Sequence, residues 1–181
     1  MKLQSSTLKK LQTDQELVDI YRDELDSESL TGIISDFSDD FLLLSVFTDA
    51  GMAGGFSIIF RQDISRVRWG SNALEAMKAL ICFHQSQGLF PAIPLNDLNE
   101  ILTSVQSQFG YINVHTERIR DGVCFVGEIK ELDGHTLLLH EYGLMANRDR
   151  AHLLLALDQI TRIDAEAEYE KNIRYLFAGN R

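Results

Sequence analysis

The sequence predicts a mainly β protein with flanking helices, an α+β fold of two tandem five-stranded units related by internal duplication. The first observation is a repeated pattern, because GIISDFSDDFLLL at residues 32–44 reappears as GEIKELDGHTLLL at residues 127–139, which is 95 positions later. The second is the tetrapeptide ISRV at 64–67, which reappears as ITRI at 160–163, which is 96 positions later. Self-similarity at a nearly fixed spacing indicates a duplicated structural unit. It predicts an architecture and leaves the activity open.

The length of the chain fits two small units. Its 181 residues are 45% hydrophobic, and units of this size bury only a modest fraction of their surface, so packing or oligomerisation helps to stabilise them. We expect a first unit at residues 1–87, a linker at 88–95 and a second unit at 96–181. The linker segment holds both prolines of the chain, Pro91 and Pro94.

In the first half, a helix is expected over residues 7–16, where Leu8 and Leu11 repeat at helical spacing. Short apolar stretches separated by turn residues then predict five strands. A closing helix is expected from Asn72, which has capping-box spacing to Glu75 ahead of an apolar stripe. The five expected strands span residues 17–23, 30–37, 41–48, 56–61 and 64–69.

The second half has the same predicted order. A helix over residues 96–109 places its apolar residues on one stripe, with Asn96 as the N-cap and Gly110 as the stop. Asp133 and Gly134 are typical of a hairpin turn. The expected strands span about 112–118, 123–132, 136–142, 151–157 and 160–164.

A last helix is expected over residues 166–177. Helical spacing turns Tyr169, Ile173 and Leu176 inward and leaves Glu170 and Arg174 on the solvent face, four residues apart. This helix closes the second unit as the helix from Asn72 closes the first.

Two patterns carry a resemblance to a known family. Gly32 and Gly127 lie in the second strand of each half, where a bent strand needs a residue without Cβ, and each precedes a turn and a leucine triplet. The segment 58–62, followed by Ile64 and Val67, forms a second, shorter pattern. Together they resemble the two motifs of the Sm-like small β-barrel. The resemblance implies two tandem Sm-like five-stranded barrels, which commonly assemble edge to edge. It therefore implies a homo-oligomer, a dimer or small ring, formed through barrel strand edges.

The resemblance weakens at the residues that bind RNA. RNA-binding Sm proteins carry an asparagine after the second-strand turn, where this chain has Leu42 and Leu137. They also carry an Arg-Gly pair, whereas Arg61 is followed by Gln62. Binding of single strands needs stacking side chains and a positive groove, and the sequence shows neither plainly. RNA is therefore the disfavoured partner.

A regulator that binds single-stranded RNA is nevertheless kept as the alternative function. Acidic neighbours such as Glu117 and Asp149 favour ordinary surface ion pairs for the basic residues of the second half. The candidate phosphate contacts are Arg61, Arg118, Arg120, Arg148 and Arg150.

The sequence contains no recognisable catalytic or cofactor motif. The glycine-rich segment 50–55 lacks the GxGxxG spacing and the lysine of a phosphate-binding loop. His135, His140 and His152 have no HExxH or His-x-His spacing. We therefore expect no enzymatic activity, no catalytic residue, no cofactor and no metal.

The leading functional hypothesis is a non-catalytic interaction or assembly module in the cytoplasm. No apolar run approaches the ~20 residues that span a bilayer, and the first residues lack the apolar core of a secretory signal. Cys82 and Cys124 are isolated, which indicates free thiols in a reducing compartment. A net charge of −10 would suit a basic protein partner. No contact with a membrane is expected.

Overall fold

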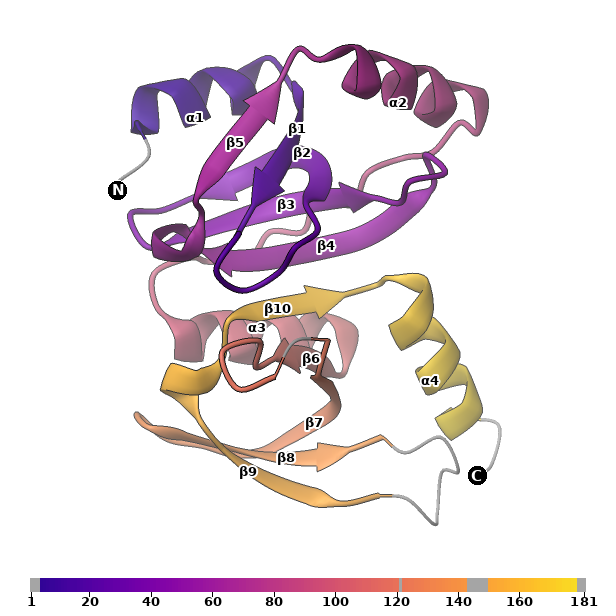
Figure 1. The fold of residues 1–181 in the computed structure, drawn as a ribbon. Coiled ribbons are helices and arrows are strands. Elements are labelled where there is room, and N and C mark those ends of the chain that lie inside the picture. The colour runs from indigo at the N-terminus through magenta and orange to yellow at the C-terminus, as the bar shows by residue number, and fades with distance from the viewer. Residues whose placement is uncertain (1–3, 121, 143–149, 179–181) are drawn as a thin grey trace. The chain divides into compact units, whose positions relative to one another are not determined.

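A computed structural model describes residues 4–120, 122–142 and 150–178. The chain divides into two compact units, Met1–Ala92 and Ile93–Arg181, called unit 1 and unit 2. The elements follow the same order in both units (Figure 1). Unit 1 contains α1 (Ser5–Thr13), β1 (Leu17–Tyr21), β2 (Leu30–Phe37), β3 (Phe41–Phe47), β4 (Ala53–Phe60), η1 (Arg61–Asp63), β5 (Arg66–Trp69) and α2 (Asn72–Phe83). Unit 2 contains α3 (Leu98–Phe109), β6 (Ile112–His115), β7 (Cys124–Leu132), β8 (Thr136–Glu141), β9 (His152–Ala156), η2 (Leu157–Gln159), β10 (Arg162–Ala165) and α4 (Glu168–Ala178).

The strands of each unit form an open antiparallel sheet. The order is β5-β1-β2-β3-β4 in unit 1 and β10-β6-β7-β8-β9 in unit 2. The predicted closed Sm-like barrels are therefore wrong. Closure would require β4 to pair with β5, and β9 with β10, but these strands occupy opposite edges of their sheets. The short 3-10 turns η1 and η2, which follow β4 and β9, redirect the chain so that it reaches the far edge.

Unit 1 packs its two helices on alternating residues of β1. Leu8 and Leu11 of α1 join Val18 and Ile20 in the main cluster, as the sequence predicted for this helix. Leu17 instead joins the cluster that contains α2. Because successive side chains of a strand point to opposite faces, both faces of β1 are covered, and burial reaches 0% exposure at Val18 and Ile20.

Two helix starts lie one residue away from the predicted caps. Asp97, and not Asn96, caps α3, because its Oδ1 accepts from the backbone N–H of Glu100 at 2.9 Å. Ser71, and not Asn72, caps α2 by accepting from the N–H of Leu74 at 3.3 Å. Short polar side chains in extended conformation are what N-caps require. The predicted stop is confirmed, since Gly110 ends α3 with a φ of 80°.

The predicted inward face of helix α4 is partly wrong. Ile173 is buried, but Tyr169 and Leu176 are 53% and 40% exposed. Glu170, which was expected on the solvent face, is 2% exposed. No described helix has both the length and the apolar run needed to cross a bilayer.

A glycine and a bulge recur in the second strand of each unit. A Cβ on Gly32 would collide with the carbonyl oxygen of Ser45, and one on Gly127 with that of His140. Register shifts follow between residues 34 and 36 and between 129 and 131. A glutamine of the preceding helix bonds the backbone beside each shift: Gln12 donates to the carbonyl of Ser35 at 2.6 Å, and Gln106 donates to that of Ile129 at 3.2 Å.

We expect Gly32→Ala and Gly127→Ala each to lower the free energy of unfolding by about 1–3 kcal/mol, the usual cost of forcing atoms into a packed site. Gly134→Ala is the matched control, because a Cβ there meets nothing within 4 Å. Urea denaturation of the three variants measures the difference. Equal stability of Gly32→Ala and Gly134→Ala would contradict the close backbone approach.

Candidate interaction surface

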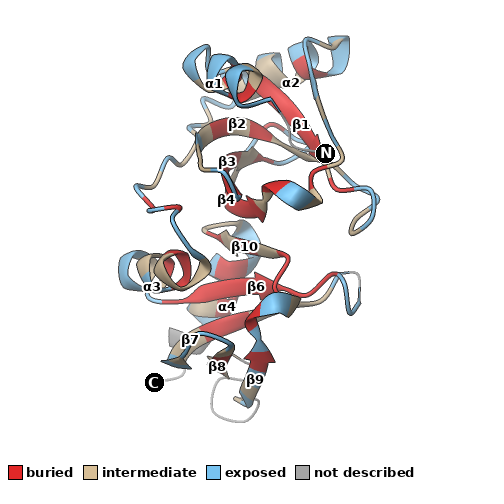
Figure 2. Ribbon diagram, turned by 90° about the vertical axis from the view of Figure 1, so that its left-hand side faces the viewer, coloured by how far each residue is buried: buried red, intermediate tan, exposed pale blue. Residues whose placement is uncertain are grey.

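Helix α2 packs on unit 1 through a narrow face. Leu74 is its only side chain described as buried, and it contacts a cluster with Leu17 and Phe47. Met77 and Ile81 are partly buried against the same cluster. Figure 2 shows most of this helix in the exposed colour. A large part of its surface therefore faces solvent.

The exposed side of α2 carries an apolar stripe, which we call the α2 stripe: Ala73, Ala76, Leu80 and Phe83. All four are exposed, with Leu80 at 40% and Phe83 at 78%. Their spacing of three, four and three residues is that of a helix-packing seam, and none of them is charged. Helix α2 thus has two apolar faces, one packed on unit 1 and one exposed. Because a helix that is apolar all round is normally buried, the exposed apolar face indicates a site of interaction.

The charges of α2 lie off the stripe, and one ion pair joins the helix to the rest of unit 1. The ammonium of Lys78 lies 2.8 Å from a carboxylate oxygen of Glu16 and 2.9 Å from one of Glu75. These hydrogen bonds raise the pKa of Lys78 above its ordinary value. Ion pairs as exposed as these contribute little stability. The packing of Leu74, Met77 and Ile81 on the cluster with Leu17 and Phe47 sets the rotation that leaves the stripe outward.

A groove of about 450 Å³ runs beside α2. Leu17 and Ile33 of the sheet and Ile81 and Cys82 of the helix are among the residues that line it. Cys82 is exposed and has no disulfide partner. The groove adds partly apolar surface next to the stripe.

Arg61, the predicted RNA contact of unit 1, is engaged inside that unit. It is 7% exposed, and its guanidinium donates to the carbonyl oxygen of Ser38 at 2.5 Å and to the hydroxyl of Ser5 at 3.3 Å. It also lies 5.6 Å from the ring of Phe37. These contacts join η1 to the β2–β3 turn and to α1.

Arg150 is engaged inside unit 2 in a similar way. Its Nε donates to the carbonyl oxygen of Glu141 at 3.1 Å, and its guanidinium lies 3.7 Å from the carboxylate of Glu128 and 5.4 Å from the ring of Tyr142. These contacts attach the start of β9 to β7 and β8.

The other predicted RNA contacts are in the second half of the chain. Arg118 and Arg120 are exposed in the turn after β6. Arg118 approaches the carbonyl oxygen of Ile160 at 3.5 Å. Arg148 lies outside the described residues. The contact of these five arginines with RNA stays a prediction.

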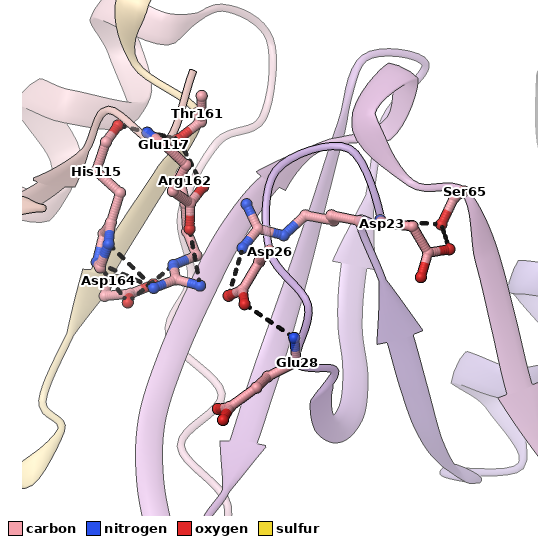
Figure 3. A network of polar contacts seen from close by, with 10 residues as sticks. Asp23, Asp26, Glu28, Ser65, His115, Glu117, Thr161, Arg162 and Asp164 are labelled. Carbon is pink, nitrogen blue, oxygen red and sulfur yellow. Dashed lines mark hydrogen bonds and ion pairs between the residues drawn. The ribbon is translucent and has the colours of Figure 1, made fainter. Parts of the chain in front are cut away.

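A buried polar network in unit 2 was missed by the sequence reasoning. The hydroxyl of Thr161 donates to Oε2 of Glu117 at 2.6 Å, and Arg162 lies 3.2 Å from the same carboxylate. Arg162 also contacts Asp164 at 3.1 Å, and Nε2 of His115 lies 2.8 Å from Asp164 (Figure 3). Thr161 is 0% and Glu117 7% exposed. This burial makes the network costly to break.

The same kind of contacts occurs at the corresponding place in unit 1. The hydroxyl of Ser65 donates to Asp23, and Arg66 lies 2.8 Å from Asp23 and 3.9 Å from the ring of Tyr21. Here the arginine is 60% and the aspartate 44% exposed. The repeated tetrapeptides contain the hydroxyl and the arginine of each set. Asp23 escaped notice because it falls outside the repeated stretches, and Glu117 was expected in a surface ion pair but is buried.

Glu170 anchors α4 to β6. Its Oε1 accepts from the side-chain amide of Asn113 at 2.6 Å, and both side chains are buried. Burial raises the pKa of Glu170, and the negative charge of Asp164 raises it further. Burial is also the main cause that raises the pKa of the nearby Cys124 thiol, which favours its neutral form.

The histidines considered as metal ligands lie mostly on two paired strands. The rings of His140 on β8 and His152 on β9 are parallel, with centroids 4.5 Å apart. Burial, followed by the charge of Arg150, lowers the pKa of His140. In the part of the chain that the structure describes, no three His, Cys, Asp or Glu side chains are placed to hold a metal ion.

No family model, curated protein or solved structure matches this chain.

We expect Thr161→Val to lower the free energy of unfolding by about 1–3 kcal/mol, because it leaves Glu117 buried without this hydrogen bond. Ser65→Ala, its counterpart in the exposed set, should cost less than about 1 kcal/mol. Urea unfolding of both variants tests the difference. Equal losses would show that burial does not distinguish the two sets.

Glu170→Gln should change how stability depends on pH. Because the folded chain holds the proton of Glu170 more tightly than the unfolded chain does, the carboxyl contributes stability below its unfolded pKa, and that contribution is lost as the pH rises through the raised folded pKa. The stability of the wild type relative to Glu170→Gln should therefore fall from about pH 4 towards neutrality. Thermal unfolding of both proteins across this range measures the difference. A constant difference would contradict the burial of an ionisable Glu170.

Proposed function

We propose that the chain is a non-catalytic assembly module that binds a partner polypeptide through the α2 stripe. The observation that carries this proposal is the exposure of an uncharged apolar seam on a helix whose other face already packs on its own unit. The chemistry of the partner follows from the same observation. It presents an apolar helix face without charges.

The spacing of the stripe favours a helix over other partner structures. Residues three and four positions apart form the ridges that fit the grooves of a second helix. Amphipathic helices are commonly recognised through anchors at such spacings, with an aromatic side chain as a frequent anchor. Phe83, with 78% of its surface exposed, is the natural anchor of this stripe.

Charge does not select the partner at this surface. The net charge of −10 would favour a basic protein at long range. The stripe itself carries no charge, and the carboxylates of Glu16 and Glu75 are bonded to Lys78. A contact at the stripe is therefore driven by apolar burial and is insensitive to the sign of the partner's charge.

The RNA alternative gains no support from two of its five arginines. Arg61 and Arg150 donate to backbone carbonyls of their own units, so their use as phosphate contacts would require these bonds to be replaced. RNA binding stays a prediction, and so does assembly through strand edges.

A stapled model helix with alanine and leucine at its seam positions and glutamate and lysine elsewhere should bind the full chain. Fluorescence anisotropy of the labelled helix should show saturable binding. Leu80→Asp/Phe83→Asp should weaken it at least about tenfold, because a carboxylate would be buried without a partner.

The matched control is Ile119→Asp, which places the same charge at another exposed apolar residue, 63% exposed in unit 2. This control should leave binding unchanged. Absence of binding to the wild type, or an equal loss in the control, would overturn the proposed function.

A further inference from the structure

The α2 stripe is symmetric about its middle. Ala73 and Phe83 lie five residues to either side of position 78, and Ala76 and Leu80 lie two residues to either side. Each pair therefore joins one small and one large side chain. Reversing the direction of the helix about position 78 exchanges small residues for large ones.

We propose, on the basis of the proposed function, that the partner is a second copy of this chain. Its α2 packs antiparallel against the first across a two-fold axis that crosses the stripe midway between Ala76 and Leu80. In this arrangement Phe83 lies over the partner's Ala73, and Leu80 lies over the partner's Ala76. Both ends of the contact are equivalent, as an isologous interface requires.

The geometry of a helix accommodates this pairing. With a rise of 1.5 Å per residue, Ala73 and Phe83 lie about 15 Å apart along the axis, so the two Phe–Ala contacts are well separated. Packed helices approach to about 8–10 Å depending on the side chains between them. Because an alanine lies opposite each large residue, the two helix axes can approach to about 8 Å. The ring of Phe83 then packs over the small side chain of the partner's Ala73.

Electrostatics permits two acidic chains to meet here. Each copy carries a net charge of −10, which opposes association at most surfaces. The stripe contains no charged residue, and Glu75 and Lys78, which neutralise one another, lie off it. The antiparallel arrangement also sets the positive N-terminal end of each helix beside the negative C-terminal end of the other. The stripe is thus a surface where self-contact meets little repulsion.

The expected assembly is a closed dimer of modest affinity. A two-fold contact uses the same surface on both copies and leaves none of it free for a third. One seam of this length is smaller than a standard stable interface. Dissociation should therefore be visible on dilution, and added salt should favour the dimer by screening the repulsion between copies.

Sedimentation equilibrium of four full-length proteins tests the pairing. All four carry Cys82→Ser, which prevents a disulfide between exposed thiols. The proteins carry wild-type α2, Phe83→Ala, Ala73→Phe, and the exchange Ala73→Phe/Phe83→Ala. Phe83→Ala should raise the dimer Kd at least about tenfold by removing the anchor. Ala73→Phe should also raise it, because two phenylalanines then meet at each end. The exchange restores one phenylalanine opposite one alanine and should return Kd to within about threefold of the wild type.

A monomeric wild type at all concentrations would overturn the inference, and so would an exchange variant as weak as Phe83→Ala. The proposed function is judged separately by the model helix. If that helix binds and the chain stays monomeric, the interaction surface stands and the second copy is excluded as its partner. Circular dichroism should show that the helices stay formed in all four proteins, because Ala73, Cys82 and Phe83 are all exposed.

Discussion

The close approach of two backbones at a glycine in the second strand of each sheet is the constraint that organises both units. The carbonyl oxygen of Ser45 or His140 occupies the space that a Cβ would need at Gly32 or Gly127. Two residues further on, a bulge shifts the register and bends the strand. A bulge also leaves backbone groups without a ladder partner, and those groups need hydrogen bonds elsewhere. In both units a glutamine of the preceding helix provides one. The N-terminal helix is thus attached to the sheet at the place where the sheet bends.

A second recurring device connects the first strand of each sheet to the last. A hydroxyl and an arginine from the end of the sheet meet a carboxylate that follows the first strand, as Ser65, Arg66 and Asp23 in unit 1 and Thr161, Arg162 and Glu117 in unit 2. The contacts agree, but the exposure does not, since Thr161 is fully buried. A surface ion pair contributes little, whereas a buried one is costly to break. Breaking these contacts should therefore cost more free energy of unfolding in unit 2 than in unit 1.

The sequence predicted the elements well, because apolar periodicity and turn residues are local signals. The sequence-based predictions were wrong where contacts between residues distant in the sequence determine the structure. Sheet closure depends on which strands become neighbours, and the 3-10 turns after β4 and β9 carry no strong signature. Glu170 looked solvent-exposed because its spacing to Arg174 fits a surface ion pair, yet Asn113 on a distant strand bonds it in the interior. The sequence predicted one apolar stripe on the helix that begins at Asn72. Leu74, Met77 and Ile81 form the face that packs on the sheet, and the exposure of Leu80 and Phe83 could be seen only in the structure. The internal duplication remains a prediction.

The two closing helices show why only one of them is suited to a seam. Helix α4 exposes Tyr169 and Tyr175, but Lys171 and Arg174 lie among them and pair with Glu166. A partner that covered this face would have to desolvate those charges, which costs more than the aromatic contact returns. The charged residues of helix α2 lie outside its stripe, where Lys78 pairs with Glu16 and Glu75. The stripe itself contains only alanine, leucine and phenylalanine. Burying it requires no charged side chain of the stripe itself to lose water. Helices at the same place in the element order thus differ in what a partner would have to desolvate, and that difference points to α2 as the interaction surface.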